Sequence, residues 1–261
     1  MLDSMLIAVS GLAAHQQRLD VTSNNLANVN TPGFKKARVN FEDLMYQQLT
    51  QGQSPEMARL APYSMSLGMG TVAASVEQLF SQGDLRQTDR PLDVAIQGQG
   101  FFEVERPDGT SAYTRLGSFR VNDLGEIVTG EGYRLAGSFR VPVDATEINI
   151  APDGVILVDV PGESTGIDIG EIQLVNFVNP GALDPIGGGL YRATESVGLP
   201  AVAPPGEAGL GLLRQGFLEA ANVDFVEELV ELVAAQRAYQ LNARVLQVSD
   251  EILAEINGLR R

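Results

Sequence analysis

The sequence contains no cysteine and no tryptophan, and His15 is its only histidine. The absence of cysteine excludes disulfide bonds and thiolate metal sites, although it leaves the redox compartment open. A lone histidine beside a helical repeat is more often a packing or surface residue than a metal ligand or a general base. Because the chain has no cysteine and one histidine, and its acidic pairs lack metal-ligand spacing, we expect no metal site.

Positive charge and long apolar runs are scarce as well. The 18 lysines and arginines are outnumbered by 33 acidic residues, which gives a formal net charge of −15. Such a chain is repelled by nucleic acid and by anionic membranes, so we expect neither as a partner. No run approaches the ~18 apolar residues of a membrane-spanning helix, which predicts no membrane insertion. Residues 1–17 lack the charged start of a secretory signal, so any export is expected to proceed without a cleaved signal peptide.

Catalytic motifs are almost absent too. The sequence has no HExxH, Walker A, EF-hand or GxGxxG motif. Its single G-x-S-x-G match, residues 162–166, lacks the later histidine that a hydrolase needs, because His15 lies far upstream. A secreted hydrolase using Ser164 is one alternative, but the motifs as a whole predict a chain with no enzymatic activity and no cofactor.

Both ends of the chain carry the spacing of long amphipathic helices. From Leu2 the apolar residues recur in alternating steps of three and four, the spacing of a heptad seam, and the turn residues 30–33 end the series. Near the C-terminus, Asp224 with Glu227 three residues later resembles a capping box and begins a second series. Because lone helices depend on packing, we expect the two ends to pair with each other and with those of neighbouring subunits. The predicted seams consist of Leu2, Met5, Val9, Leu12, Leu19 and Leu26, interrupted by Gln16 and Ser23, and of Leu232, Tyr239, Asn242, Leu246, Leu253 and Ile256.

The middle of the chain has the character of β-strands. Apolar residues alternate there, as Phe102 does with Val104, and turn sequences such as Pro152-Asp153-Gly154 interrupt them. We therefore predict an α+β fold, in which N- and C-terminal α-helices pair as a coiled-coil-like layer and the central domain is mainly β. The expected parts are residues 1–33 and 215–261 as paired terminal helices, residues 34–80 as an extended linker arm or small β segment, and residues 81–214 as a β-rich domain.

Within that linker, residues 51–70 combine prolines and glycines with apolar side chains such as Met57, Leu60 and Tyr63. The prolines and glycines favour an extended path over a helix. The apolar side chains are too many for a freely solvated loop, which predicts an arm that lies across a neighbouring subunit. A long disordered linker is the alternative.

Four stretches stand out in order along the chain, at residues 25–35, 93–102, 113–119 and 215–242. Together they resemble the flagellar rod and hook protein family, and the resemblance covers essentially the whole chain. One departure is Ala220-Ala221, where the family often has a hydroxyl residue before an Asn-Val pair. The residues that carry the signature are Asn25, Asn28, Thr31, Gly33, Phe34, Gly98, Gly100, Phe101, Asn222, Gln236, Arg237 and Tyr239.

The resemblance implies a structural role. It implies a subunit of the bacterial flagellar basal-body rod that polymerises into a helical tube and transmits torque from motor to hook. The terminal helices would form the inner assembly layer, and the β-rich domain would face outward. Residues 51–70, the turn at Pro152 and residues 190–194 resemble the distal type of rod subunit, with the proximal type as the alternative within the family.

The resemblance also implies partners and a location. The implied partners are further copies of the chain, other rod proteins, the hook protein and the flagellar type III export apparatus, with the rings around the rod as further candidates. The implied location is the flagellar basal body, on the periplasmic side of the inner membrane. A monomeric β-sandwich binding module is the remaining alternative from another class, and it would keep ordered ends in dilute solution.

Overall fold

The computed structural model describes residues 2–49, 65–137, 139–161 and 166–258. Over these residues the chain forms an N-terminal helix, a C-terminal helix and a central, mainly β region, which confirms the predicted α+β class. No helix in the described ranges is both long and apolar enough to cross a membrane. The described side chains also include no cluster of histidines and acidic residues placed to hold a metal ion. Most of the predicted arm, residues 51–70, lies outside these ranges.

The chain divides into two compact units. One, here called the helical unit, contains residues 1–26, 37–77 and 225–261, and the other, the β unit, contains residues 27–36 and 78–224. The predicted division set residues 34–80 apart from both helices. The compact units group residues 37–77 with the two helices. Strands within residues 37–49 and 65–77 contact the N-terminal helix.

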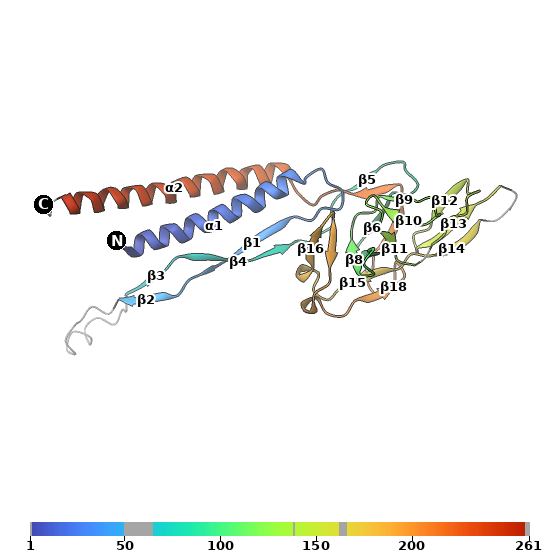
Figure 1. Cartoon of the computed structure of the whole chain (residues 1–261), viewed down its shortest axis with the longest axis horizontal. Coiled ribbons are helices and arrows are strands. Elements are labelled where there is room, and N and C mark those ends of the chain that lie inside the picture. Colours follow the sequence, from blue (N-terminus) through green and yellow to red (C-terminus); the bar gives the residue numbers. More distant parts are fainter. Residues whose placement is uncertain (1, 50–64, 138, 162–165, 259–261) are drawn as a thin grey trace. The chain divides into compact units, whose positions relative to one another are not determined.

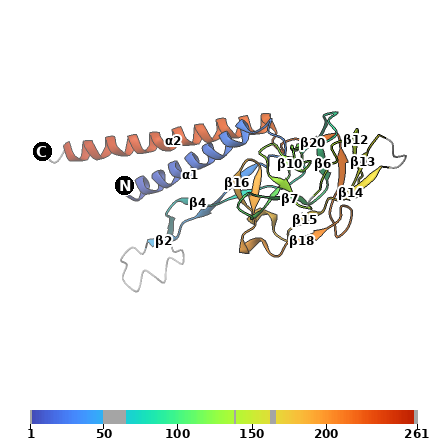
Figure 2. The ribbon, with the colours of Figure 1, turned by 45° about the vertical axis from the view of Figure 1, so that its right-hand side comes forward.

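The helical unit consists of two helices and a β-ribbon, which lie side by side in Figures 1 and 2. The helices are α1 (Leu2–Ala27) and α2 (Phe225–Gly258). In the ribbon, β1 (Ala37–Asp43) pairs with β4 (Thr71–Gln78), and β2 (Tyr46–Leu49) pairs with β3 (Met65–Gly68). Glu227 and Glu228 occupy the first turn of α2, where acidic residues favour the positive end of the helix dipole.

The β unit is built on a sheet with the strand order β16-β17-β8-β7-β11-β10-β9, to which β15 and β18 are added beside β7. Smaller groups among the described residues are β5 with β20, β6 with β19, and β12-β13-β14. The strand bounds are β5 (Leu85–Gln87), β6 (Val94–Gln97), β7 (Phe101–Glu105), β8 (Ser111–Thr114), β9 (Phe119–Val121), β10 (Ile127–Thr129), β11 (Arg134–Leu135), β12 (Glu147–Ile150), β13 (Val155–Asp159), β14 (Ile167–Glu171), β15 (Leu174–Asn176), β16 (Asp184–Gly187), β17 (Leu190–Arg192), β18 (Ala201–Ala203), β19 (Leu212–Gln215) and β20 (Phe217–Glu219). Short 3₁₀ turns, η2 (Pro180–Ala182) and η3 (Glu195–Val197), connect some of them.

Two buried clusters form the core of the β unit. The larger contains Phe102 and Val104, both without solvent exposure, and the Phe102 ring meets the Phe119 ring edge-on at a centroid distance of 5.1 Å. Because Phe101 and Phe102 are adjacent in β7, they point to opposite faces of the sheet and serve different clusters. The second cluster consists of Phe101, Tyr113, Val175, Phe177, Leu183, Tyr191 and Val197, with Phe80 packed against it.

We predict that Phe102→Ala destabilises the β unit by about 3–5 kcal/mol, because it deletes a fully buried ring and leaves a cavity. Urea denaturation should show a lower midpoint with an unchanged m-value. Val143→Ala is the control: Val143 is 99% exposed, and its truncation should change stability by no more than ~0.5 kcal/mol. Equal losses in both variants would contradict this assignment of the core.

Candidate assembly site

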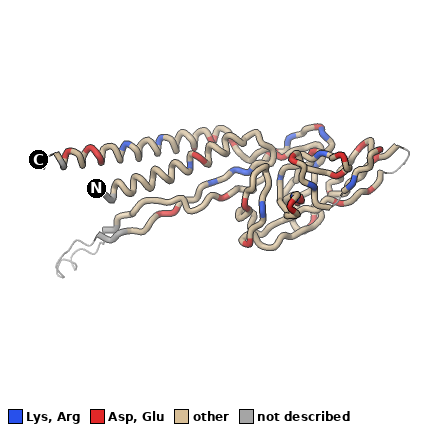
Figure 3. The backbone as a smooth tube through the Cα atoms, viewed as in Figure 1, with Lys and Arg blue, Asp and Glu red and all other residues tan. Residues whose placement is uncertain are grey.

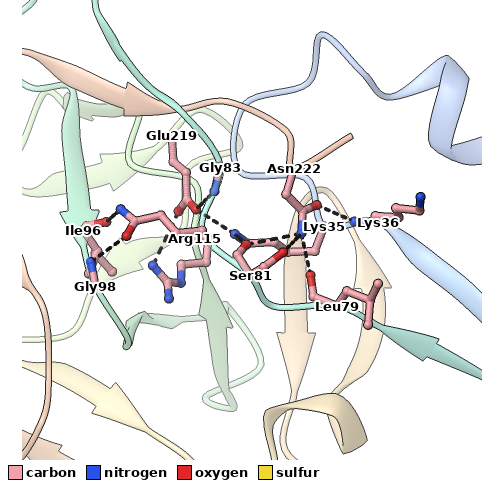
Figure 4. Close-up of polar contacts among 11 residues, drawn as sticks. Lys35, Lys36, Leu79, Ser81, Gly83, Ile96, Gly98, Arg115, Glu219 and Asn222 are labelled. Carbon is pink, nitrogen blue, oxygen red and sulfur yellow. Dashed lines mark hydrogen bonds and ion pairs between the residues drawn. The ribbon is translucent and has the colours of Figure 1, made fainter. Parts of the chain in front are cut away.

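The segments that connect the two units are hydrogen-bonded together inside the β unit. The chain passes between the units at residues 26/27, 36/37, 77/78 and 224/225. Leu79 N–H donates to Lys36 O at 2.8 Å, and Gly33 N–H donates to Glu219 O at 2.7 Å. We call residues 33–36, 79–83 and 219–222 the chain-end junction, and Figure 4 draws its polar side chains.

The side chain of Asn222 ties the segments of the junction to one another. Its Nδ2 donates to Leu79 O at 2.7 Å and to Ser81, at 3.2 Å to the carbonyl oxygen and 2.9 Å to Oγ. Its Oδ1 accepts from Lys36 N–H at 2.7 Å (Figure 4). An amide suits this position because it donates and accepts at once. One signature residue therefore links the segments that follow α1, follow β4 and precede α2.

An ion cluster is buried in the same junction. Lys35 Nζ lies 2.7 Å from Glu219 Oε1 and donates to Ser81 O at 2.8 Å. Arg115 Nη1 lies 3.4 Å from Glu219 Oε2, and Gly83 N–H donates to Oε1 at 2.8 Å. Lys35 is fully buried, and Arg115 and Glu219 are only 4% and 2% exposed. A single carboxylate thus joins parts of the chain that are far apart in sequence.

Burial changes the proton affinity of these groups. Desolvation lowers the pKa of Lys35, while the negative charge of Glu219 and its hydrogen bond act in the opposite direction. Desolvation also lowers the pKa of Arg115 and raises the pKa of Tyr191 to about 12. Removing one partner of such a buried pair leaves an uncompensated charge, which is strongly destabilising. The cluster therefore constrains all the segments that contribute to it.

Other residues of the N-terminal signature form the turn that ends α1. Thr31 N–H donates to Asn28 O at 3.0 Å, Thr31 Oγ1 donates to Asn28 Oδ1 at 3.2 Å, and Phe34 N–H donates to Thr31 O at 3.3 Å. Gly33 has a φ of +67°, and a Cβ there would lie 3.0 Å from Leu116 N. Both the backbone conformation and the lack of space require glycine at this position.

The central signature lies within the β unit, against the loop before β19. A Cβ on Gly98 would lie 2.7 Å from Gly211 Cα, and one on Gly100 would lie 2.9 Å from Leu210 Cδ2. Phe101 follows in β7, is 2% exposed and has the Arg115 guanidinium 5.3 Å from its ring centroid. Through Phe101 and Arg115, the aromatic cluster lies beside the chain-end junction.

In the helical unit, Asn25 joins α1 to the ribbon and to α2. Its Nδ2 donates to Ala37 O at 2.9 Å and to Glu228 Oε2 at 3.2 Å, and its Oδ1 accepts from Ala37 N–H at 2.9 Å. The amide therefore pairs with β1 as a neighbouring strand would. A second contact joins Ser10 Oγ to Thr71 N–H at 3.3 Å, so the ribbon follows α1 over 15 residues, or about 22 Å at 1.5 Å per residue.

The face of α1 that meets α2 is made of small and polar residues. Arg18 Nη2 lies 3.5 Å from Glu231 Oε2, and a Cβ on Gly11 would lie 2.8 Å from Asn242 Nδ2. Together with the Asn25–Glu228 contact, these pairs show that the helices run antiparallel. The sequence of α1 contains three charged residues, Asp3, Arg18 and Asp20. Most of this helix is accordingly tan in Figure 3.

The predicted seam of α1 consists of residues that directly follow, in sequence, the residues of this face. Gly11, Arg18 and Asn25 are followed directly by the seam positions Leu12, Leu19 and Leu26, which are partly buried. Successive residues of a helix are rotated by about 100° around its axis, so the seam lies beside the contact with α2. Val9 is 51% exposed and Met5 is partly buried. Leu2 begins α1, and its side chain is outside the described part. That this seam contacts other subunits stays a prediction.

On α2 the predicted seam is on the side of the contact with α1. Leu232, Asn242, Leu246 and Leu253 are partly buried there. Tyr239 and Ile256 are 36% and 46% exposed. Gln236 and Arg237, from the C-terminal signature, are exposed on α2.

A second apolar stripe runs along α2, and it was not predicted from the sequence. Its members are spaced by three or four residues, or by seven or eight, which keeps them on one face of the helix. This face lies on the side of α2 away from the fully buried Ala235. Their exposed fractions range from 42% to 68%. This outer stripe consists of Val226, Val230, Val233, Leu241, Val248 and Ile252.

The residues that hold the junction and the β unit together were also not predicted from the sequence. Lys35, Arg115 and Glu219 lie inside the motifs used for the resemblance, where their charges among apolar neighbours were the available signal. Gln215 was missed as well. Its Nε2 donates to Pro91 O at 2.8 Å and Ile148 O at 2.7 Å, and its Oε1 accepts from Ile150 N–H at 3.1 Å.

The chain matches known proteins along its whole length. Residues 5–35 match the family described as flagella basal body rod protein, residues 95–158 the flagellar hook protein FlgE/F/G D1 domain, and residues 214–259 the flagellar basal body rod FlgEFG protein C-terminal family. The flagellar basal-body rod protein FlgG of Buchnera aphidicola subsp. Schizaphis graminum is 43% identical over 99% of this chain and all of its own length. FlgG of Caulobacter vibrioides is 41% identical over 99% of this chain, and FlgG of Bacillus subtilis is 40% identical over 100% of it, each over the whole length of the relative.

We predict that Asn222→Ala destabilises the subunit by about 1–3 kcal/mol, because it leaves Lys36 N–H and the carbonyl of Leu79 without their partner. Urea denaturation of the purified chain measures the loss. Asn40→Ala is the matched control, since among the described residues the Asn40 side chain bonds to Ser75 and Glu77, two side chains of its own ribbon. If both alanine variants lose the same stability, Asn222 has no special role in the junction.

Proposed function

The chain belongs to the flagellar rod and hook protein family and is a structural subunit of the flagellar basal-body rod, and we propose that its copies polymerise into the distal part of that rod. In this proposal the polymer is a helical tube that transmits torque from motor to hook. The observation that carries it is the outer stripe of α2, which stays exposed in the subunit. Covering such a face by a second copy removes apolar surface from water.

The two helices offer different surfaces for this contact. The outer stripe lies on α2, whereas the seam positions Val9 and Leu12 lie on the flank of α1. A contact between two different surfaces of identical subunits is heterologous, and it propagates as an open helix when the rotation does not close. This supports a filament rather than a closed dimer.

We propose that residues 1–33 and 215–261 form the inner layer of the tube and that residues 81–214 face outward. The grouping of residues 37–77 with the helices supports placing the β-ribbon in the inner layer as well. The prediction that residues 51–70 lie across a neighbouring subunit remains part of the proposal, because most of that segment is outside the described residues.

As a rod protein, the chain is placed in the flagellar basal body. We further propose that it lies on the periplasmic side of the inner membrane and is exported by the flagellar type III apparatus without a cleaved signal peptide. Other rod proteins and the hook protein are the proposed partners at the ends of its segment, and the surrounding rings are candidates along it.

We also propose that the role is purely structural. The hydrolase-like match at residues 162–166 lies outside the described residues except for Gly166. Its Ser164 has no histidine later in the sequence to act as a general base. The chemistry that this function needs is packing, and the signature residues described above serve packing.

We predict that Val230→Asp and Leu12→Asp each abolish rod assembly and motility, because assembly would bury an unpaired carboxylate, which costs several kcal/mol per subunit. Val230 is 64% exposed, so the free Val230→Asp subunit should keep the thermal stability of the parent chain. Swimming assays and electron micrographs of basal bodies are the measurements.

Gln247→Asp is the control, since it adds the same charge at an exposed position of α2 outside the outer stripe. It should leave motility intact. Normal rods in the Val230→Asp strain would remove the outer stripe from the assembly contacts.

A further inference from the structure

The carboxylate of Glu219 is shared unequally by two cations. Lys35 holds it tightly, with Nζ 2.7 Å from Oε1. Arg115 holds it loosely, through one nitrogen at 3.4 Å. Arg115 Nε is buried and has no hydrogen-bond partner in the described part of the chain. Arginine ordinarily binds a carboxylate through two parallel N–H bonds, so the capacity of Arg115 is only partly used.

The cluster also holds more positive than negative charge. Among the described residues, Glu219 is the carboxylate within ion-pair distance of Lys35 and of Arg115. Two cations therefore share one anion in a place where all three side chains are at most 4% exposed. Consistent with this crowding, burial lowers the pKa of both Lys35 and Arg115. One counterion would be enough to neutralise Glu219.

The two cations come from different parts of the β unit. Lys35 belongs to residues 27–36, the short segment that connects α1 to the ribbon, here called the docking segment. Arg115 follows β8, and Glu219 ends β20, so both belong to the sheet-bearing part of the unit. The docking segment is also held by backbone bonds from Gly33 N–H to Glu219 O, from Leu79 N–H to Lys36 O and from Asn222 N–H to Phe34 O. In addition, Lys36 N–H donates to the side chain of Asn222.

We propose that Arg115 is a reserve counterion, which takes over Glu219 when the docking segment and its Lys35 detach. Without it, detachment would leave a carboxylate buried and unpaired, and the surrounding strands would lose stability with the segment. With it, the docking segment detaches and re-docks while β5, β20 and the aromatic cluster stay folded. The junction is then a reversible attachment for the end of α1. This concerns the subunit alone and does not depend on its place in the rod.

A double-mutant cycle on the full-length chain tests the proposal, with amide hydrogen exchange measured by NMR. In Lys35→Met, exchange at Gly33 and Lys36 should rise by about tenfold or more, whereas Gly83 N–H, bonded to Glu219, should change by less than about threefold. In Arg115→Met, Lys35 still neutralises Glu219, so Gly33 and Lys36 should keep their protection.

The double variant Lys35→Met/Arg115→Met should lose more stability than the sum of the two single losses, because only there is Glu219 without a cation. The proposal would be supported equally if both single variants fold and the double variant does not. Additive losses, an unfolded Lys35→Met chain, or equal loss of protection at Gly33 and Gly83 in Lys35→Met would each overturn it. Arg38→Met is the control, since its ion pair with Glu77 is exposed.

Discussion

A buried carboxylate is the constraint on which the arrangement of the chain ends depends. Glu219 is 2% exposed and cannot be left without a cation. Lys35, which meets it, comes eight residues after the last residue of α1, and Asn222 stands three residues before the first residue of α2. Within the β unit, the chain-end junction therefore joins the segment that follows α1 to the segment that precedes α2, although 184 residues separate Lys35 from Glu219 in sequence. The backbone bond from Gly33 to Glu219 reinforces the same pairing.

The helices then pack through residues that leave their larger apolar side chains uncovered. Gly11 and Ala235 are small, and they allow α1 and α2 to approach closely within the helical unit. Val9 on α1 and the outer stripe on α2 stay exposed. Each copy carries a net charge of −15, so association between copies is repulsive except where uncharged, apolar surfaces meet. The exposed stripe is such a surface, which connects the packing of one subunit to its proposed polymerisation.

The period of the helices and the β character of the middle could be predicted from the sequence, because both follow from the spacing of apolar residues. The face of α1 used within the subunit could not, since Ala8, Gly11 and Thr22 carry little hydrophobic signal and pack by being small. Lys35 resembled a surface residue, because lysine is rarely buried without a partner and its partner is distant in sequence. The pairing of β1 with β4 also joins distant segments, and for this reason residues 34–80 were compatible with either an extended linker arm or a small β segment.

The proposed assembly requires neighbouring copies to cover the outer stripe of α2 in the rod. Because the chain has no cysteine, Val230→Cys introduces a single thiol, and a maleimide reports on that position alone. If the stripe is covered, the thiol should react readily in the free subunit, be protected in intact basal bodies and react again after the rods are dissociated. Equal labelling of the free subunit and the intact rod would contradict it.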